Sequence, residues 1–339
     1  MAHQHARLFQ QNPDCEIVAA CDIDAQRVSD FAKTYSISNV YTDVDRLLKE
    51  SGCDAVSVVA PDSFHYSLSL KAIAAGKHIL CEKPLALDHE EAAEMRDAAQ
   101  KAGVVNMVNF SYRNSSAIQK ATALVAAGAL GTIRHVSAYY HQSWLVQDAW
   151  GDWRTNPAWL WRLSKGHGSA GTLGDIGIHL LDFASMPLGT FANVNCRTKT
   201  FPKAEDDVVG DYTLDANDTA IITAEFTNGA LGSLQVTRWA YPHVNAIKLE
   251  LYGDKATIEI DLNASTTSLK MNRILGRDIM PWETLECGET PTNYDRFITS
   301  IKTGSQDQPD FARGADMQAV LDACHESAET DKTIKIHNA

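Results

Sequence analysis

The sequence predicts a protein of two domains, an α/β domain with a parallel sheet followed by an α+β domain with a mostly antiparallel sheet. Short apolar segments typical of buried strands alternate with helical segments up to residue 110. From Phe191 onward the pattern changes to longer strands separated by tight turns. The chain has 339 residues, which accommodates about two domains, each with its own core. We therefore expect the first domain to span residues 1–112 and the second to span residues 113–339.

The composition and charge of the chain disfavour some classes of binding partner. Hydrophobic residues make up 45% of the chain and charged residues 22%, as in an ordinary globular protein. The net charge of −13 disfavours binding to nucleic acid or to anionic membranes. The chain begins without the apolar segment of a secretory signal. Its seven cysteines are scattered without a Cys-x-x-Cys pair, which predicts reduced thiols in the cytoplasm and neither a disulfide framework nor a metal site.

The first domain reads as strands and helices in alternation. Strands are expected at 16–22, 54–60, 78–82 and 104–110, and helices at 3–12, 25–35, 43–50, 64–75 and 89–102. Such alternation gives a doubly wound, Rossmann-type sheet that binds nucleotides at the carboxyl ends of its strands. The chain starts inside a helix and contains no G-x-G-x-x-G loop, so the first strand and the glycine loop are expected to be missing. A late start codon, a truncation or a domain that binds pyrophosphate poorly would each account for this.

Polar residues follow the predicted strands. Asp22 closes the first one, where an acid accepts hydrogen bonds from the adenosine ribose and repels a 2′-phosphate, so it favours NAD over NADP. Its alternative role is to cap the next helix, although Asp24 suffices for that. Lys83 lies at another strand end, and a cis bond to Pro84 would direct it into the ligand crevice. An exposed lysine before a turn is the alternative. His65 lies in the first turn of a helix that follows Pro61.

A glycine-rich loop at 166–174 leads into a helix expected to begin near Asp175. Asp175 and His179 are four residues apart, so they share one face of that helix and form an acid/base pair. The alternative is that Asp175 is an N-cap and His179 a hydrogen-bonded core histidine.

The second domain begins with a helix at 115–127 and a strand at 133–142, followed by a segment with five tryptophans. Trp153, Arg154 and their neighbours suit stacking on a sugar and hydrogen bonding to its hydroxyls. A hydrophobic contact between subunits is the alternative. Further strands are expected at 219–226, 231–240, 247–251, 256–260 and 333–336, with Asn228-Gly229 as a hairpin turn, and helices at 294–302 and 315–329. A sheet covered by helices on one face leaves the other for self-association.

These segments together resemble one enzyme family. The motifs are CDIDAQR, APDSFH, AGKHILCEKPLA, NFSYR and GDIGIHLLD, in that order along nearly the whole chain. They resemble the Gfo/Idh/MocA family, which includes glucose–fructose oxidoreductase, inositol dehydrogenase and rhizopine-catabolism proteins. The chain departs from the family pattern in lacking the glycine loop and in having Asp62 where asparagine is common.

The resemblance implies an NAD(P)-dependent oxidoreductase that acts on a CH–OH group of a sugar, sugar derivative or cyclitol. In the matching positions, His179 would be the general base, Lys83 would stabilise the alkoxide, and Asp175 would position one of them. The implied cofactor contacts are Asp22, Pro61, His65, Glu82, Lys83, Pro84 and Asn109. The implied substrate contacts are Lys83, Arg113, Trp153, Arg154, Asp175 and His179.

The resemblance also implies a homodimer or homotetramer formed through the C-terminal sheet. Two other functions stay open. One is a glycoside-cleaving enzyme that oxidises its substrate transiently with tightly held NAD. The other is a non-catalytic, sugar-sensing regulator.

Overall fold

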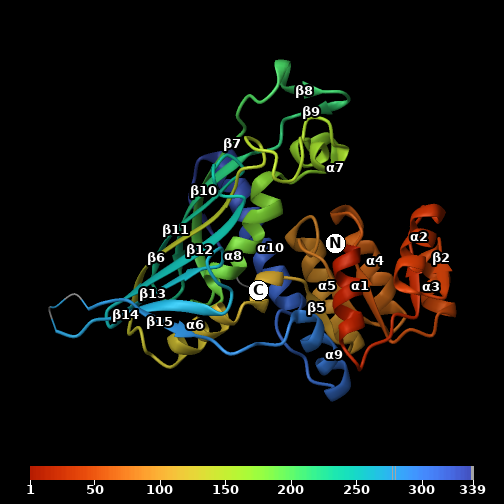
Figure 1. The fold of residues 1–339 in the computed structure, drawn as a ribbon, viewed down its shortest axis with the longest axis horizontal. Coiled ribbons are helices and arrows are strands. Elements are labelled where there is room, and N and C mark those ends of the chain that lie inside the picture. The colour runs from red at the N-terminus through yellow and green to blue at the C-terminus, as the bar shows by residue number, and fades with distance from the viewer. Residues whose placement is uncertain (277, 279, 337–339) are drawn as a thin grey trace. The chain divides into compact units, whose positions relative to one another are not determined.

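A computed structural model of the chain describes residues 1–276, 278 and 280–336 (Figure 1). The chain forms two compact units, the first made of Met1–Ser111 with Pro291–Gln318 and the second of Tyr112–Thr290 with the residues from Ala319 onward. The predicted boundary after residue 112 lies next to the end of the first segment. Residues 291–318, which the prediction placed in the second domain, group with the first unit instead, because Tyr294 and Phe297 pack with Phe9 and Leu80 in one buried cluster.

The first unit is built from short parallel strands and helices. Its strands are β1 (Ala19–Cys21), β2 (Asn39–Tyr41), β3 (Ala55–Val58), β4 (His78–Cys81) and β5 (Asn106–Val108). Its helices are α1 (Ala2–Gln11), α2 (Ala25–Tyr35), α3 (Val44–Glu50), η1 (Asp62–Phe64), α4 (His65–Ala74), α5 (His89–Ala102) and α9 (Asn293–Thr303). β1 and β2 pair in one parallel sheet, and β3, β4 and β5 form another. Among the described residues no strand joins the two sheets.

The ends of these helices follow from their capping residues. The Asp24 side chain accepts hydrogen bonds from the backbone N–H groups of Gln26 and Arg27, so Asp24 is the N-cap of α2. Asp88 caps α5 in the same way, and Gly103 ends it at a positive φ of 66°. The predicted alternation of strands and helices in this unit is therefore confirmed.

The second unit contains one nine-stranded sheet in the order β15-β14-β13-β12-β6-β11-β10-β7-β16. The neighbouring strands are antiparallel except for β6 and β11, which pair in parallel, so the predicted mostly antiparallel sheet is confirmed. The Asn228-Gly229 turn joins β10 to β11 as predicted. The strand bounds are β6 (Ile133–Gln142), β7 (Phe191–Lys199), β10 (Thr219–Phe226), β11 (Leu231–Thr237), β12 (Asn245–Gly253), β13 (Ala256–Asp261), β14 (Ser268–Arg273), β15 (Glu283–Glu286) and β16 (Ile334–Lys335).

Helices cover one face of this sheet, as Figure 1 shows for α8 (Ile178–Ser185). The other longer helices of the unit are α6 (Ser116–Ala126) and the end of α10 (Phe311–Thr330), whose first residues belong to the first unit. Residues on the strands alternate between buried and accessible, so the opposite face carries side chains such as Ile221 and Leu231, each more than half exposed.

The remaining elements are short. They are η2 (Ser111–Asn114), α7 (Pro157–Leu160), η3 (Trp161–Leu163), η4 (Lys165–His167), η6 (Glu205–Asp207), β8 (Val208–Val209) and β9 (Tyr212–Thr213). Strands β2, β7, β8, β9, β14 and β15 fall outside the ranges predicted from the sequence. All of them except β7 are two to six residues long and mostly polar or exposed. Within the described part of the chain, every helix is too short or too polar to cross a membrane.

The helix that carries Asp175 begins earlier than predicted. Helical structure starts at Gly171, passes through a π-helical segment at Leu173–Gly177 and continues as α8. The glycines that suggested a loop allow close packing instead. Gly171 has a φ of +71°, and a Cβ atom there would meet the Asn217 side chain at 2.3 Å. Asn217 in turn caps the helix, accepting hydrogen bonds from the backbone N–H groups of Thr172 and Leu173 at 2.8 and 3.0 Å.

Candidate active site

In the first unit, a buried carboxylate gathers partners from several elements. Glu82 follows β4, and its Oε1 atom lies 2.7 Å from His5 Nε2 of α1 and accepts a hydrogen bond of 2.8 Å from Asn109 Nδ2 after β5. Tyr294 of α9 lies 3.0 Å from the same Asn109 amide. Burial by itself would raise the pKa of Glu82, but the hydrogen bonds from His5 and Asn109 lower it to about 2. Glu82 therefore stays ionised and ties three segments of this unit together.

Lys83 follows this carboxylate directly and is partly buried. The Lys83–Pro84 peptide is cis, as the sequence suggested. His65, at the start of α4, is fully buried, and its two ring nitrogens lie 2.7 Å from the Pro84 carbonyl oxygen and 3.0 Å from the Ala60 carbonyl oxygen. His65 thus connects the segments that follow β3 and β4. Burial by itself would lower the pKa of His65, but Cys81 and the Pro84 carbonyl raise it to about 9, so both ring nitrogens donate at neutral pH.

Asp22 lies after β1, where a dinucleotide-binding sheet places its ribose-binding acid. Its Oδ1 atom accepts hydrogen bonds from the Asp24 backbone at 2.9 Å and from Arg27 at 3.3 Å. The Asp22 side chain is 32% exposed, so part of the carboxylate faces solvent. Since Asp24 caps α2, Asp22 is not needed as the cap.

In the second unit, two arginines converge on Asp175. Arg238, which follows β11, is fully buried and donates a hydrogen bond of 2.9 Å to Asp175 Oδ2. Arg162 Nε lies 3.7 Å from the same oxygen. Arg238 is itself fixed by a 3.0 Å hydrogen bond to the Arg162 carbonyl and by the Trp144 ring, 4.9 Å from its guanidinium carbon. These contacts exclude the N-cap alternative, because Asp175 lies within the helix and its carboxylate binds side chains.

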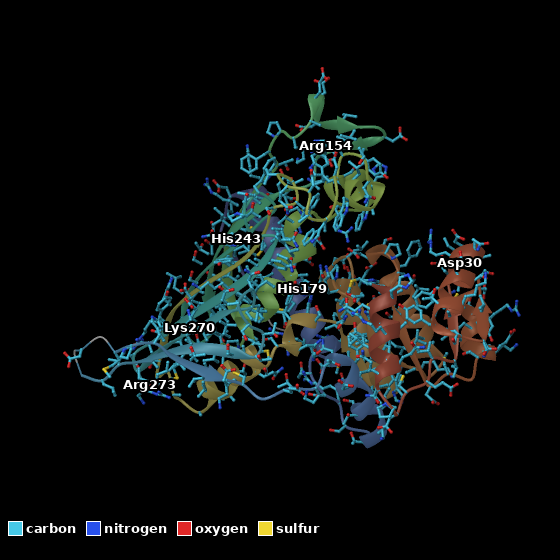
Figure 2. All side chains as sticks on the ribbon, in the orientation of Figure 1. Asp30, Arg154, His179, His243, Lys270 and Arg273 are labelled. Carbon is cyan, nitrogen blue, oxygen red and sulfur yellow. The ribbon has the colours of Figure 1, made fainter. Side chains whose placement is uncertain are left out.

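His179 lies on α8, one turn beyond Asp175, and is 9% exposed (Figure 2). Its ring packs edge-to-face against Tyr112, with centroids 5.0 Å apart. The His179 Nδ1 atom is enclosed by protein. One further turn along α8, Asp182 forms a buried bidentate pair with Arg113, with N–O distances of 2.6 and 2.7 Å. Arg113, a predicted substrate contact, is therefore paired with an aspartate on the helix that carries His179.

The tryptophan segment forms a small hydrophobic core. Trp153 is 1% exposed, and Trp144, Leu145, Leu160 and Leu214 surround it. Both faces of Trp153 are thus covered by protein side chains. Arg154, labelled in Figure 2 on the segment before α7, is half exposed, lies over the Trp153 ring at 4.6 Å and pairs with Asp152.

Several residues of these clusters were not predicted from the sequence, among them His5, Tyr112, Arg238 and Tyr294. His5 lies in the predicted helix at 3–12, to which the sequence assigned no functional residue. Tyr112 is the residue before Arg113 in the NFSYR motif, and Arg238 follows a strand directly. A charged residue at the end of a buried strand was the one available signal for Arg238, and the same signal identified Lys83.

Comparison with known proteins assigns both halves of the chain to one group of enzymes. Residues 1–110 match the profile of an oxidoreductase family with an NAD-binding Rossmann fold, named GFO_IDH_MocA. Residues 118–259 match the profile of a GFO/IDH/MocA C-terminal domain.

Similar proteins cover the chain from end to end. It is 27% identical to levoglucosan dehydrogenase of Pseudarthrobacter phenanthrenivorans, over 93% of this chain and 88% of the relative. It is 29% identical to D-glucoside 3-dehydrogenase of Escherichia coli, over 98% of this chain and 93% of the relative. A solved structure of levoglucosan dehydrogenase in complex with NADH and levoglucosan superposes with a TM-score of 0.88 at 25% identity, covering 100% of this chain and 98% of the other.

Proposed function

Because the chain belongs to the Gfo/Idh/MocA family of NAD-binding oxidoreductases, we propose that it transfers a hydride between NAD and a carbinol carbon of a sugar, with His179, Asp175 and Lys83 as its catalytic residues. The observation that carries this proposal is that Asp175 and His179 lie on one helix. Asp175 and His179 lie one turn apart, and two arginines hold the Asp175 carboxylate in a fixed place. An imidazole and a fixed carboxylate on the same face of one helix are suited to general base catalysis.

The residues of the first unit fit a dinucleotide. Asp22 offers a partly exposed carboxylate at the end of β1, as the ribose hydroxyls require. Pro61, His65, Glu82, Pro84 and Asn109 shape and support the segments after β3, β4 and β5. Of these residues, His65, Glu82 and Asn109 act through their buried hydrogen bonds. Lys83 provides the side chain for contact with the nicotinamide ribose. NAD, when bound, supplies the hydride acceptor.

The chain's own residues handle the proton and the developing charge. Since His179 Nδ1 is enclosed by protein, Nε2 is the nitrogen that takes the hydroxyl proton. For Lys83, the family resemblance supports the role of stabilising the negative charge of a developing alkoxide. Asp175 orients the catalytic groups and accepts a hydrogen bond from a neighbouring hydroxyl.

The relatives suggest the class of sugar. Levoglucosan is an anhydro sugar with the glucose configuration, and the second relative is named for D-glucosides. We therefore expect a glucose-configured pyranoside. The exposed Arg154 guanidinium is available for its hydroxyls, while Trp153 and Arg113 support the site through the contacts described above.

The sheet face that carries Ile221 and Leu231 suits self-association into a homodimer or homotetramer, because its apolar side chains are exposed in the single chain. Leu231→Arg, which places a charge on that face, would lower the mass measured by light scattering. A cytoplasmic location stays a prediction from the cysteine pattern.

The test is NADH formation, followed by absorbance with NAD and either levoglucosan or methyl β-D-glucoside. His179→Ala should lower turnover roughly 10²- to 10⁴-fold, whereas His3→Ala, at an exposed position of α1, should not. Unchanged turnover in His179→Ala would refute the assignment of the base. Release of the aglycone without net NADH would indicate the glycoside-cleaving alternative, and binding of sugar and NAD without any turnover would indicate the sensor.

A further inference from the structure

A chain of polar side chains leads from the buried tryptophan cluster to Tyr112, and its direction is fixed at one end. Trp144 Nε1, which can only donate, makes a hydrogen bond of 3.0 Å to Gln142 Oε1. The Gln142 amide is thereby oriented, and its Nε2 atom donates to Asn245 Oδ1 at 2.8 Å. Asn245 is oriented in turn, with its Nδ2 atom donating to the Tyr112 hydroxyl oxygen at 3.3 Å.

These orientations determine the direction of the hydrogen bonds made by the Tyr140 and Tyr112 hydroxyls. Tyr140 lies 2.8 Å from Asn245 Oδ1, which is an acceptor, so the Tyr140 hydroxyl must donate there. The Tyr112 and Tyr140 oxygens are 2.6 Å apart. Because Tyr140 has already used its single proton, Tyr112 donates to Tyr140. Burial raises the pKa of Tyr140 well above its usual range, and Tyr112 raises it further, so Tyr140 keeps that proton at neutral pH.

The only proton of the Tyr112 hydroxyl is therefore engaged in the hydrogen bond to Tyr140. Toward a ligand, the Tyr112 oxygen can only accept a hydrogen bond. The Tyr112 ring packs on His179, so this acceptor belongs to the same site as the proposed base. Tyr112 is partly exposed, whereas Tyr140 and Gln142 behind it are buried. A ligand that reaches the site thus meets an oxygen that can accept a hydrogen bond and cannot donate one.

We propose that Tyr112 is a specificity-determining residue that binds one hydroxyl of the sugar strictly as a hydrogen-bond donor. The proposal rests on the proposed sugar dehydrogenase function and adds a rule to it. At one position of the sugar ring, neither fluorine, which only accepts a hydrogen bond, nor a hydrogen atom can replace the hydroxyl. A site built to bind a hydroxyl discriminates strongly against analogues that lack it.

The experiment measures binding rather than turnover. Methyl β-D-glucoside and its monodeoxy and monodeoxyfluoro analogues are titrated by calorimetry into the protein saturated with NADH. At one ring position, the unmodified chain should bind the hydroxyl compound about tenfold more tightly than either analogue. Tyr112→Phe should abolish this preference at that position and retain it at the others. Tyr66→Phe, which removes a surface hydroxyl that donates to Glu94, is the matched control and should leave all ratios unchanged.

A second variant tests the direction of the hydrogen bonds. Tyr140→Phe removes the oxygen that takes the Tyr112 proton, so Tyr112 becomes able to donate. The fluoro analogue should then bind more tightly than the deoxy analogue at the same position, a difference that the unmodified chain does not show. Equal binding of the two analogues to Tyr140→Phe would overturn the assigned direction.

The outcomes separate this proposal from the function on which it rests. Hydroxyl ratios that are the same in Tyr112→Phe and in the unmodified chain refute the role of Tyr112, even if NADH is formed normally. Ratios that change as expected without any NADH formation refute the dehydrogenase and leave the role of Tyr112 in place. A chain that binds none of these glucosides refutes both.

Discussion

Replacing Glu82 by glutamine should destabilise the first unit by an amount that depends on pH. The Oε1 atom accepts hydrogen bonds from His5 and Asn109, and Oε2 accepts one from the Lys83 backbone N–H, so an amide in either orientation would direct its own N–H group at a donor. Glu82 is only 5% exposed, and its pKa is lowered from an ordinary value of 4.5 to about 2. At 1.36 kcal/mol per pKa unit, this difference corresponds to about 3 kcal/mol of stability at neutral pH.

The sign of the pH dependence follows from the lowered pKa. The folded state holds the ionised form more strongly than the unfolded state does, so the contribution is complete above about pH 5 and is lost as the pH falls toward 2. We expect the difference in unfolding free energy between the unmodified chain and Glu82→Gln to be about 3 kcal/mol at pH 7 and to fall to about half of that near pH 3.

The assay uses urea unfolding with two probes. All seven tryptophans lie between residues 144 and 282, so their fluorescence reports on the second unit. Hydrogen exchange of backbone amides in β4 and β5 reports on the first. The loss should appear in the exchange data, and Glu50→Gln, at an exposed pair with Arg46, should show none. Equal exchange in Glu82→Gln and the unmodified chain at pH 7, or a difference that does not shrink between pH 5 and pH 3, would refute the reasoning.

Three further predictions concern single side chains. Asp182→Asn leaves the buried Arg113 guanidinium without its counter-charge, so urea unfolding followed by fluorescence should show a loss of about 3 kcal/mol, and an unchanged curve would contradict the pairing. Trp153→Ala removes a fully buried side chain and should cost about 3–5 kcal/mol in the same assay, whereas Trp282→Ala, at a position 49% exposed, should cost less than about 0.5 kcal/mol; equal losses would contradict the assigned core. Asp22→Ser removes the carboxylate that repels a 2′-phosphate, so the preference for NAD over NADP in calorimetric titrations should fall about tenfold, and an unchanged preference would contradict the ribose role.

Local sequence features predicted much of the fold. The Asn-Gly turn, the capping aspartates and the glycines after helices act on residues close in sequence, so β10, β11, α2 and α5 follow from them directly. The glycines at 171 and 174 misled the prediction, because they allow close packing at the start of a helix and do not form a loop. The role of Gly171 depends on Asn217, which is distant in the sequence.

For the candidate site too, local features were predicted from the sequence and contacts between distant segments were not. The spacing of Asp175 and His179 on one helix is a local property and was predicted. That Arg238 would hold Asp175, or that Trp153 would be enclosed by Leu145 and Leu214, depends on how strands and loops are brought together. The sequence suggested that the tryptophans stack on a sugar or contact another subunit, but a segment with short helices needs its own core, and the largest apolar side chains supply it.

The first unit is discontinuous, and this has a consequence for its synthesis. The ribosome delivers residues 1–111 first, but α9, with Tyr294, emerges only after the whole of residues 112–290. Until then Asn109 lacks its Tyr294 contact, and the apolar cluster around Phe9 is open on one side. The second unit has its long sheet nearly complete by residue 290, so it is in a position to fold first. A nascent chain stalled before residue 291 should therefore expose the apolar surface of its N-terminal part to chaperones.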